Sequence, residues 1–263
     1  MPRRVWRVCY PCGIHFLISQ IVAWAAVNIL LYSGGDVQDY QSLVVMLTGI
    51  TGLLVMIPCT CLYRSDRRAR ISGGLLSEKR QKHLNFGEGI LIFCMGIGFS
   101  QFANILVGLF QNLLHYQQYQ ETMDQITLGK SLLTLIFWMG IIAPLAEEIV
   151  FRWLIYLRLR EYMKMGAAIV ISAAFFGIYH MNLVQAVYAG ILGAVFAYFL
   201  ELTGSIWASV LLHMGSNIWS LVFTEAAPWL LEKYPAWILV IYAVLLCTVI
   251  AGTAYFQRKQ EHS

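Results

Sequence analysis

The feature that most constrains this chain is its set of long stretches without a formally charged side chain. Residues 8–35, 40–63 and 89–120 contain no Asp, Glu, Lys or Arg. Each stretch is long enough for the helix of about 20 apolar residues that crosses a hydrocarbon core. Composition agrees, because 12% of the residues are charged and 59% are hydrophobic, whereas a soluble domain has about 25% charged residues. The sequence therefore predicts an all-α, polytopic membrane protein.

The apolar stretches divide into eight predicted spans. Residues 165–200 also carry no formal charge, and as one helix they would be about 54 Å long, far beyond a hydrocarbon core of about 30 Å. We expect this stretch to fold back near Met181 and Asn182 and to supply two spans. The others are residues 14–32, 43–63, a span within 90–114, 132–156, 205–223 and 236–256. Together they form one predicted transmembrane domain, residues 1–263, with a functional core at about 128–223.

Basic residues gather in alternate loops between the predicted spans. With eight spans, every basic segment falls on one side of the membrane, so the positive-inside rule predicts that both termini are cytoplasmic. The same rule accounts for the basic loops without nucleic acid, which we do not expect as a partner. The basic residues of these segments are Arg3, Arg4, Arg7, Arg64, Arg67, Arg68, Arg70, Lys79, Arg80, Lys82, Arg158, Arg160, Lys164, Arg258 and Lys259. The loops on the opposite side are poor in Lys and Arg and contain Asp36, Asp39, Glu121, Asp124 and Glu225.

Two adjacent carboxylates and an arginine lie inside the fourth predicted span. Ionisable groups in a membrane cost several kcal/mol unless they are paired or solvated in a cavity, so they indicate a functional site. Glu148 and Arg152 are four residues apart, share a helix face and can form an ion pair. Glu147 points about 100° away, has no partner on its own helix, and is free to accept a proton from water. The alternative is that all three lie at the cytoplasmic interface of the membrane. Arg158, Arg160 and Lys164, further along the chain, already mark that interface.

Two further spans carry polar side chains at a similar depth. Phe176 and His180 share a face of the fifth span, and His213 and Asn217 share a face of the seventh. At 1.5 Å per residue, Glu147, His180 and His213 lie about 20, 21 and 14 Å from the basic ends of their spans. A lone intramembrane histidine is often a packing residue. Polar groups at one depth on three helices instead predict a polar cavity within the membrane.

These residue types suit the hydrolysis of an acyl group. A carboxylate such as Glu147 can act as a general base on water, and an imidazole can share that water or protonate the leaving amine. A second histidine with an asparagine can donate hydrogen bonds to the oxyanion. The same residue types also allow zinc, bound by Glu147, His180 and His213, to activate the water. Residue types leave both chemistries open, although the HExxH zinc motif and the GxSxG nucleophile motif are absent from the sequence.

The chain resembles the CPBP or Abi family of CAAX proteases and bacteriocin-processing proteins, which includes the eukaryotic Ras-converting CAAX endopeptidase. The resemblance covers about residues 143–217. One departure is Trp153, where the family often has Gly. The resemblance is carried by three motifs in the family's order: EExxxR (Glu147, Glu148 and Arg152), FxxxH (Phe176 and His180) and HxxxN (His213 and Asn217).

The resemblance implies an intramembrane endopeptidase of eight helices whose cavity opens to the cytosol, in a bacterial plasma membrane. Its partners would be the lipid bilayer and a hydrophobic or lipidated peptide or protein substrate. The family includes proteins described as metalloproteases and as metal-independent glutamate proteases, so the implied cofactor is zinc or none. The main alternative is a non-catalytic protein that confers bacteriocin immunity or binds a peptide. The implied roles are water activation for Glu147 and His180, oxyanion stabilisation for His213 and Asn217, and support for Glu148, Arg152 and Phe176.

Overall fold

The computed structural model describes residues 2–74, 83–110 and 116–262, and every regular element within these ranges is a helix. One long helix, residues 132–160, is built from five segments that include two of π-helical geometry, η2 and η3. The elements are α1 (Pro2–Ser33), α2 (Val37–Ser72), α3 (Phe86–Leu109), α4 (Tyr116–Thr127), α5 (Leu132–Leu135), η2 (Ile136–Ile142), α6 (Ala143–Glu148), η3 (Ile149–Tyr156), α7 (Leu157–Arg160), α8 (Met165–Tyr179), α9 (Leu183–Thr203), α10 (Ile206–Lys233) and α11 (Pro235–Glu261).

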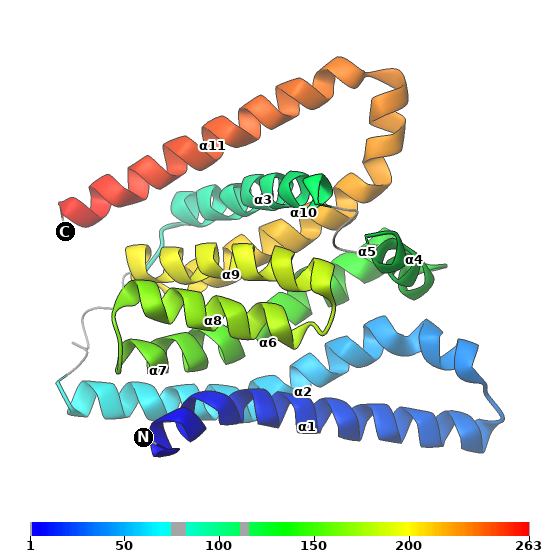
Figure 1. Cartoon of the computed structure of the whole chain (residues 1–263), viewed down its shortest axis with the longest axis horizontal. Coiled ribbons are helices and arrows are strands. Elements are labelled where there is room, and N and C mark those ends of the chain that lie inside the picture. The colour runs from blue at the N-terminus through cyan, green and yellow to red at the C-terminus, as the bar shows by residue number, and fades with distance from the viewer. Residues whose placement is uncertain (1, 75–82, 111–115, 263) are drawn as a thin grey trace.

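Seven helices of the described chain are long and apolar enough to cross a membrane. The eighth predicted span is α8, which is apolar but has 15 residues, equivalent to about 22 Å. Both termini lie at the same end of the bundle (Figure 1), as an even number of crossings requires. The protein is therefore all-α and integral to the membrane, with about eight spans.

The reversal of the chain near Met181 and Asn182 is confirmed. Met181 has a φ of 54°, in the left-handed region, and Asn182 precedes α9 as its N-cap. The side-chain oxygen of Asn182 accepts the backbone N–H of Gln185 at 3.1 Å, which satisfies one free donor of the first helical turn. The helices α8 and α9 then run antiparallel and pack side by side (Figure 1).

Two segments predicted as loops are helical instead. The helix α4 contains Glu121 and Asp124, and Glu225 lies within α10, which continues to Lys233 rather than ending near Phe223. The apolar pattern of the sequence does not predict α4, because this helix is polar and none of its residues is buried. The extension of α10 carries exposed polar side chains that resemble a loop in composition.

The predicted basic loop from Arg64 to His83 is helical in its first part, because α2 continues to Ser72. This extension carries the predicted basic residues Arg67, Arg68 and Arg70 on the helix itself. The other basic residues of that loop, which are Lys79, Arg80 and Lys82, lie outside the described residues.

Small residues bring α3 and α10 into backbone contact. A Cβ atom on Gly96 would lie 2.1 Å from the carbonyl oxygen of Leu212, and a Cβ on Gly215 would lie 2.2 Å from that of Phe93. Close approach at small residues is how helices associate in a membrane, where burying apolar surface against lipid gains little. This contact fixes the part of α10 that carries the HxxxN motif.

Charged side chains join α1 and α2 to α7 and the residue that follows it, and we call them the terminal cluster. Arg158 Nε donates to Asp66 Oδ2 at 2.6 Å, and Arg70 Nε donates to Glu161 Oε1 at 2.8 Å. Arg7 donates to both carboxylates, at 3.1 Å to Asp66 Oδ1. The cluster therefore ties the first two helices to the rest of the bundle. Its members are Arg7, Asp66, Arg70, Arg158 and Glu161.

Candidate active site

The helix that carries the EExxxR motif is irregular because a proline interrupts its hydrogen bonds. The backbone N–H of Ala143 donates to the carbonyl of Trp138, five residues back, as in a π-helix. In that register the Met139 carbonyl would need the N–H of Pro144, which proline lacks. The side-chain Nδ2 of Asn217 donates to the Met139 oxygen instead, at 2.9 Å. A side chain of α10 thus replaces the backbone donor that the sequence removes.

Glu148 is fully buried and has two cationic or polar partners. Its Oε1 lies 3.1 Å from Nη1 of Arg152, so the ion pair predicted from the four-residue spacing is confirmed. The same oxygen lies 2.9 Å from Nδ1 of His213. Glu148 and Arg152 are 0% exposed and His213 is 4% exposed. The contact between Glu148 and His213 joins α6 to α10 and was not predicted.

Glu147 has a different environment from its neighbour. Its side chain is 22% exposed, and its Oε2 lies 3.6 Å from Nε2 of His213, which is too long for a hydrogen bond. Its carboxylate makes no side-chain hydrogen bond with any other described residue. His213 therefore lies between the two carboxylates, with one ring nitrogen directed at each.

Two phenylalanine rings enclose the guanidinium group of Arg152. Its Cζ lies 4.1 Å from the ring centroid of Phe176 and 5.3 Å from that of Phe196. No guanidinium nitrogen of Arg152 has a hydrogen-bond partner among the described residues. The two cation–π contacts therefore contribute to stabilising its charge, together with the ion pair to Glu148. The space exists because Gly193 has no side chain: a Cβ there would lie 2.5 Å from Nη2 of Arg152.

The same two rings also contact His213. Phe196 stacks on the imidazole with centroids 4.8 Å apart and planes at 27°, and Phe176 meets it edge-on at 5.5 Å. Phe176 was predicted at the site, since the FxxxH motif includes it. Phe196 was not predicted, since it is one of many apolar residues in α9 and no local pattern distinguishes it.

His180 lies where α8 ends. Its Nδ1 is 2.8 Å from the carbonyl oxygen of Phe176. A carbonyl only accepts, so Nδ1 carries the hydrogen, and Nε2 of the neutral ring keeps a free lone pair. Its ring packs edge-on against that of Phe176 at 4.9 Å. No hydrogen bond or ion pair joins His180 to Glu147 in the part of the chain that the structure describes.

Most of the predicted site residues come together in one group, which we call the central cluster. Its charged and imidazole groups are Glu147, Glu148, Arg152 and His213, and Phe176 contacts two of them. His180 touches the cluster through Phe176, and Asn217 is bound to the Met139 carbonyl one turn of α10 beyond His213.

Donor types alone would suit zinc at Glu147, His180 and His213, but the three side chains do not converge. Among residues 2–74, 83–110 and 116–262, no group of three or more His, Cys, Asp or Glu side chains is arranged to hold a metal ion. His213 Nδ1 is bound to Glu148 and His180 Nδ1 to a backbone carbonyl. The described residues as arranged do not fit a metal centre.

Trp153, the departure from the family pattern, does not border the central cluster. Its Nε1 donates to the carbonyl of Ile206 at 3.2 Å. Its ring packs against those of Tyr63 and Trp207, with centroids 5.2 and 5.8 Å away. The bulky ring therefore fills the contact between α2, η3 and the start of α10.

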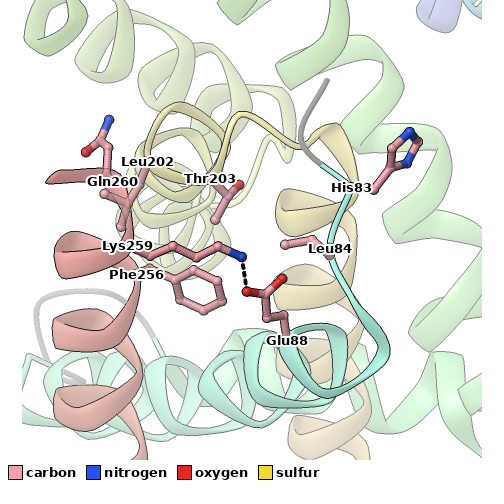
Figure 2. A pocket seen from close by; sticks show the side chains of 8 residues that line it. All are labelled: His83, Leu84, Glu88, Leu202, Thr203, Phe256, Lys259 and Gln260. Carbon is pink, nitrogen blue, oxygen red and sulfur yellow. Dashed lines mark hydrogen bonds and ion pairs between the residues drawn. The ribbon is translucent and has the colours of Figure 1, made fainter. Parts of the chain in front are cut away.

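Two surface hollows lie away from the central cluster. One, of about 20 Å³, holds about one water and lies where α3, α9 and α11 meet. Figure 2 shows the Lys259 ammonium group in this hollow, paired with Glu88. The other is an open groove on α1 lined by residues such as Trp6, Gly13 and Leu17. Neither hollow is lined by a residue of the three motifs, so chemistry rather than shape identifies the site.

Comparisons with known proteins agree with the motifs. Residues 129–219 match the family model "Type II CAAX prenyl endopeptidase Rce1-like". The chain is 24% identical over 207 residues to "Putative membrane peptidase YdiL" of Bacillus subtilis (strain 168), which covers 77% of this chain and 83% of that protein. No solved structure matches significantly. The resemblance to the CAAX-protease family is thereby confirmed, and the matched residues include all three motifs. Both matches support a membrane protease.

Proposed function

We propose that the protein is an intramembrane endopeptidase that hydrolyses a peptide bond of a membrane-associated protein or peptide, with Glu147 as general base. The observation that carries this proposal is the unequal environment of two adjacent carboxylates. Glu148 is 0% exposed and bound by Arg152 and His213. Glu147 is 22% exposed and makes no side-chain hydrogen bond within the described residues. Glu147 is therefore the carboxylate available to take a proton from water.

His180 is proposed to share the attacking water with Glu147. The free lone pair on its Nε2 accepts one O–H of the water, while the carboxylate of Glu147 accepts the other. The water oxygen then attacks the carbonyl carbon of the peptide bond, and the proton of the bond it loses passes to Glu147. The support is the hydrogen bond from His180 Nδ1 to the Phe176 carbonyl, which fixes the tautomer.

His213 and Asn217 are proposed to stabilise the oxyanion. When His213 carries a proton on both nitrogens, the central cluster contains two carboxylates and two cations and is neutral, which lowers the cost of charge inside a membrane. Its Nε2–H then lies on the Glu147 side and can donate to the developing O⁻. Asn217 retains a second amide hydrogen. When the intermediate collapses, the C–N bond breaks, its electron pair stays on nitrogen, and Glu147 returns the proton to that nitrogen.

The orientation of the protein in the membrane and the class of its substrate are proposed from the basic residues and from the position of Glu147. The end of the bundle that holds the termini and the basic residues would face the cytoplasm, in a bacterial plasma membrane. The substrate would be a hydrophobic or lipidated peptide, because the partly exposed side of Glu147 is reached within the membrane-spanning part of the chain.

Cleavage by purified variants tests the mechanism. Wild-type protein and Glu147→Gln are reconstituted in nanodiscs with lipidated and unlipidated reporter peptides. Exchanging a general base for an amide should lower the cleavage rate by about 10²–10⁴-fold, with no change in thermal midpoint. Glu232→Gln, at an exposed position on α10, is the matched control and should be fully active. Full activity of Glu147→Gln would refute the mechanism.

The reconstituted wild-type protein also decides the cofactor, and a protection assay in cells decides the non-catalytic alternative. Full activity in protein without bound zinc would support the metal-independent reaction. One zinc per chain, with activity lost on chelation and restored by zinc, would replace it with a zinc-activated water. Bacteriocin protection that survives in Glu147→Ala/His180→Ala would favour an immunity protein that does not cleave.

A further inference from the structure

A third intramembrane histidine, outside the three motifs, binds the end of α8. His15 lies in α1, well before residues 129–219, and none of the three motifs includes it. It is half-buried in the span that contains it. Placing an ionisable side chain inside a membrane span costs free energy unless the side chain is paired or solvated. The residues that His15 contacts therefore indicate its role.

The partner of His15 is Tyr179, the last residue of α8. The tyrosine hydroxyl is hydrogen-bonded to Nδ1 of His15, and the two rings meet edge-to-face with centroids 5.0 Å apart and planes at 87°. The principal packing partners of α1 are α2, η3 and α7. This pair is therefore a specific polar link from α1 to the end of α8.

Tyr179 is held on a second side by the helix that follows the carboxylates. Its ring meets that of Phe151, on η3, at 5.5 Å, and Phe151 also packs on Phe176 at 5.0 Å. Phe176 is the ring that contacts Arg152 and His213 in the central cluster. The tyrosine therefore lies at the edge of the central cluster, clamped between α1 and η3.

The covalent neighbour of Tyr179 is His180, and the chain turns immediately afterwards. His180 is the C-cap of α8, and the next residue, Met181, has a positive φ of 54°. The last turn of α8 packs closely on α9, since a Cβ on Gly177 would lie 2.4 Å from the carbonyl oxygen of Ala186, and Tyr179 holds the same turn to α1. The place of the His180 imidazole thus depends on how the residue before it is anchored.

We infer that His15 and Tyr179 are positioning residues, which fix the end of α8 so that His180 can share a water with Glu147. This inference rests on the proposed function and extends it, since it makes α1 a part of the active site although the family match begins at residue 129. Misplacing a catalytic group by about 1 Å can cost about 100-fold in rate. Loss of this single link should therefore lower kcat more than it lowers stability.

The test is a double-mutant cycle with Tyr179→Phe and His15→Leu in the full chain. Each single variant should lower kcat about tenfold, leave KM within about twofold, and shift the thermal midpoint by less than about 4 °C, the effect of roughly one hydrogen bond. The double variant should be no slower than the slower single variant, because both changes break the same link. His15→Asn, whose amide oxygen can replace Nδ1 as acceptor, should retain most of the activity.

Tyr255→Phe is the matched control, since it also removes one tyrosine hydrogen bond, to Glu88 at 2.9 Å, far from the motifs. It should leave kcat unchanged. Unchanged kcat in Tyr179→Phe, or losses that simply add in the double variant, would overturn the inference. A fall in thermal midpoint that accounts for the lost activity would overturn it as well, by making the pair merely structural.

A readout without catalysis separates this inference from the proposed function. In protein labelled with ¹⁵N-histidine, the His180 ring resonances, identified with His180→Gln, should shift or split in Tyr179→Phe and stay in place in Tyr255→Phe. Unmoved resonances would contradict the positioning role. A fully active Glu147→Gln would refute the proposed mechanism, whereas an inactive Glu147→Gln with a fully active Tyr179→Phe would refute only the role of the pair.

Discussion

The terminal cluster and the central cluster are both groups of charges that are partly or fully buried, but their hydrogen bonding differs. In the terminal cluster, each of Arg7, Arg70 and Arg158 donates at least one hydrogen bond to a carboxylate. In the central cluster, Arg152 donates none to any described residue and is held by one ion pair and two aromatic rings. Glu147 likewise has only a 3.6 Å contact.

This difference in hydrogen bonding distinguishes the charges that stabilise the fold from those that remain free to react. Hydrogen-bonded charges at the end of the bundle hold α1 and α2 against α7 and Glu161. Among the buried guanidinium nitrogens of this cluster, Nη1 and Nη2 of Arg70 lack a hydrogen-bond partner within the described residues, whereas in the central cluster all three nitrogens of Arg152 lack one. Unsatisfied groups deep in a membrane protein are costly, so a cluster that retains them is expected to use them with water or substrate.

Breaking the terminal cluster should affect stability and leave the chemistry intact. Arg158→Met removes the guanidinium hydrogen bonds to Asp66, the Arg7 carbonyl and the Tyr10 hydroxyl, while Arg7 remains bonded to Asp66. A hydrogen bond to a charged group contributes about 1.5–3 kcal/mol, so the thermal midpoint should fall by roughly 5–10 °C. The cleavage rate per folded molecule should stay within about twofold of wild type. Arg64→Met, at an exposed position on the same helix as Asp66, is the control and should change neither quantity. A tenfold loss of rate in folded Arg158→Met would contradict the division.

Variants of Asn217 test whether this side chain supports the structure of the helix or takes part in the reaction. Asn217→Ala leaves the Met139 carbonyl without a donor, which costs about 1–3 kcal/mol, and the rate should fall by roughly 10–100-fold. The addition of Pro144→Ala supplies a backbone N–H to that carbonyl. If Asn217 works by holding the helix, Pro144→Ala/Asn217→Ala should recover at least about fivefold in rate over Asn217→Ala. Recovery confined to thermal stability would instead make Asn217 an oxyanion donor.

The aromatic enclosure of Arg152 should give the smallest effect. Phe196→Leu keeps the apolar volume but removes the ring that stacks on His213 and faces Arg152. The loss of roughly 1 kcal/mol of cation–π and stacking energy should lower kcat about fivefold. Phe199→Leu removes a ring on the same helix, equally buried but packed against Phe99 and Phe256 instead, and should leave kcat unchanged. Equal effects of the two changes would show that general packing, not the enclosure, matters.

The sequence predicts most strongly those features that depend on neighbours in the chain. The lengths of the uncharged stretches give the spans, the excess length of residues 165–200 gives the reversal at Met181, and a spacing of four gives the ion pair of Glu148 with Arg152. The helix α4 was missed because a polar surface helix has no apolar signal to detect.

The unpredicted parts of the site all depend on contacts between distant segments. The contact of Glu148 with His213 joins residues 65 positions apart, and that of His15 with Tyr179 joins residues 164 apart. Phe196 is distinguished only by the rings and charge that it meets after folding. The bond from Asn217 to Met139 could be understood only when the π-helical register showed which carbonyl Pro144 leaves without a donor.

The most direct test of the central claim follows the oxygen of water through a single turnover. Excess wild-type protein cleaves a reporter peptide in H₂¹⁸O, and mass spectrometry measures the new carboxyl terminus and the peptide that contains Glu147. If Glu147 acts as a base on water, the first-turnover product carries one ¹⁸O and the Glu147 peptide carries none. An unlabelled product with ¹⁸O in the Glu147 peptide would mean that the carboxylate itself attacks the peptide bond, and would contradict the mechanism.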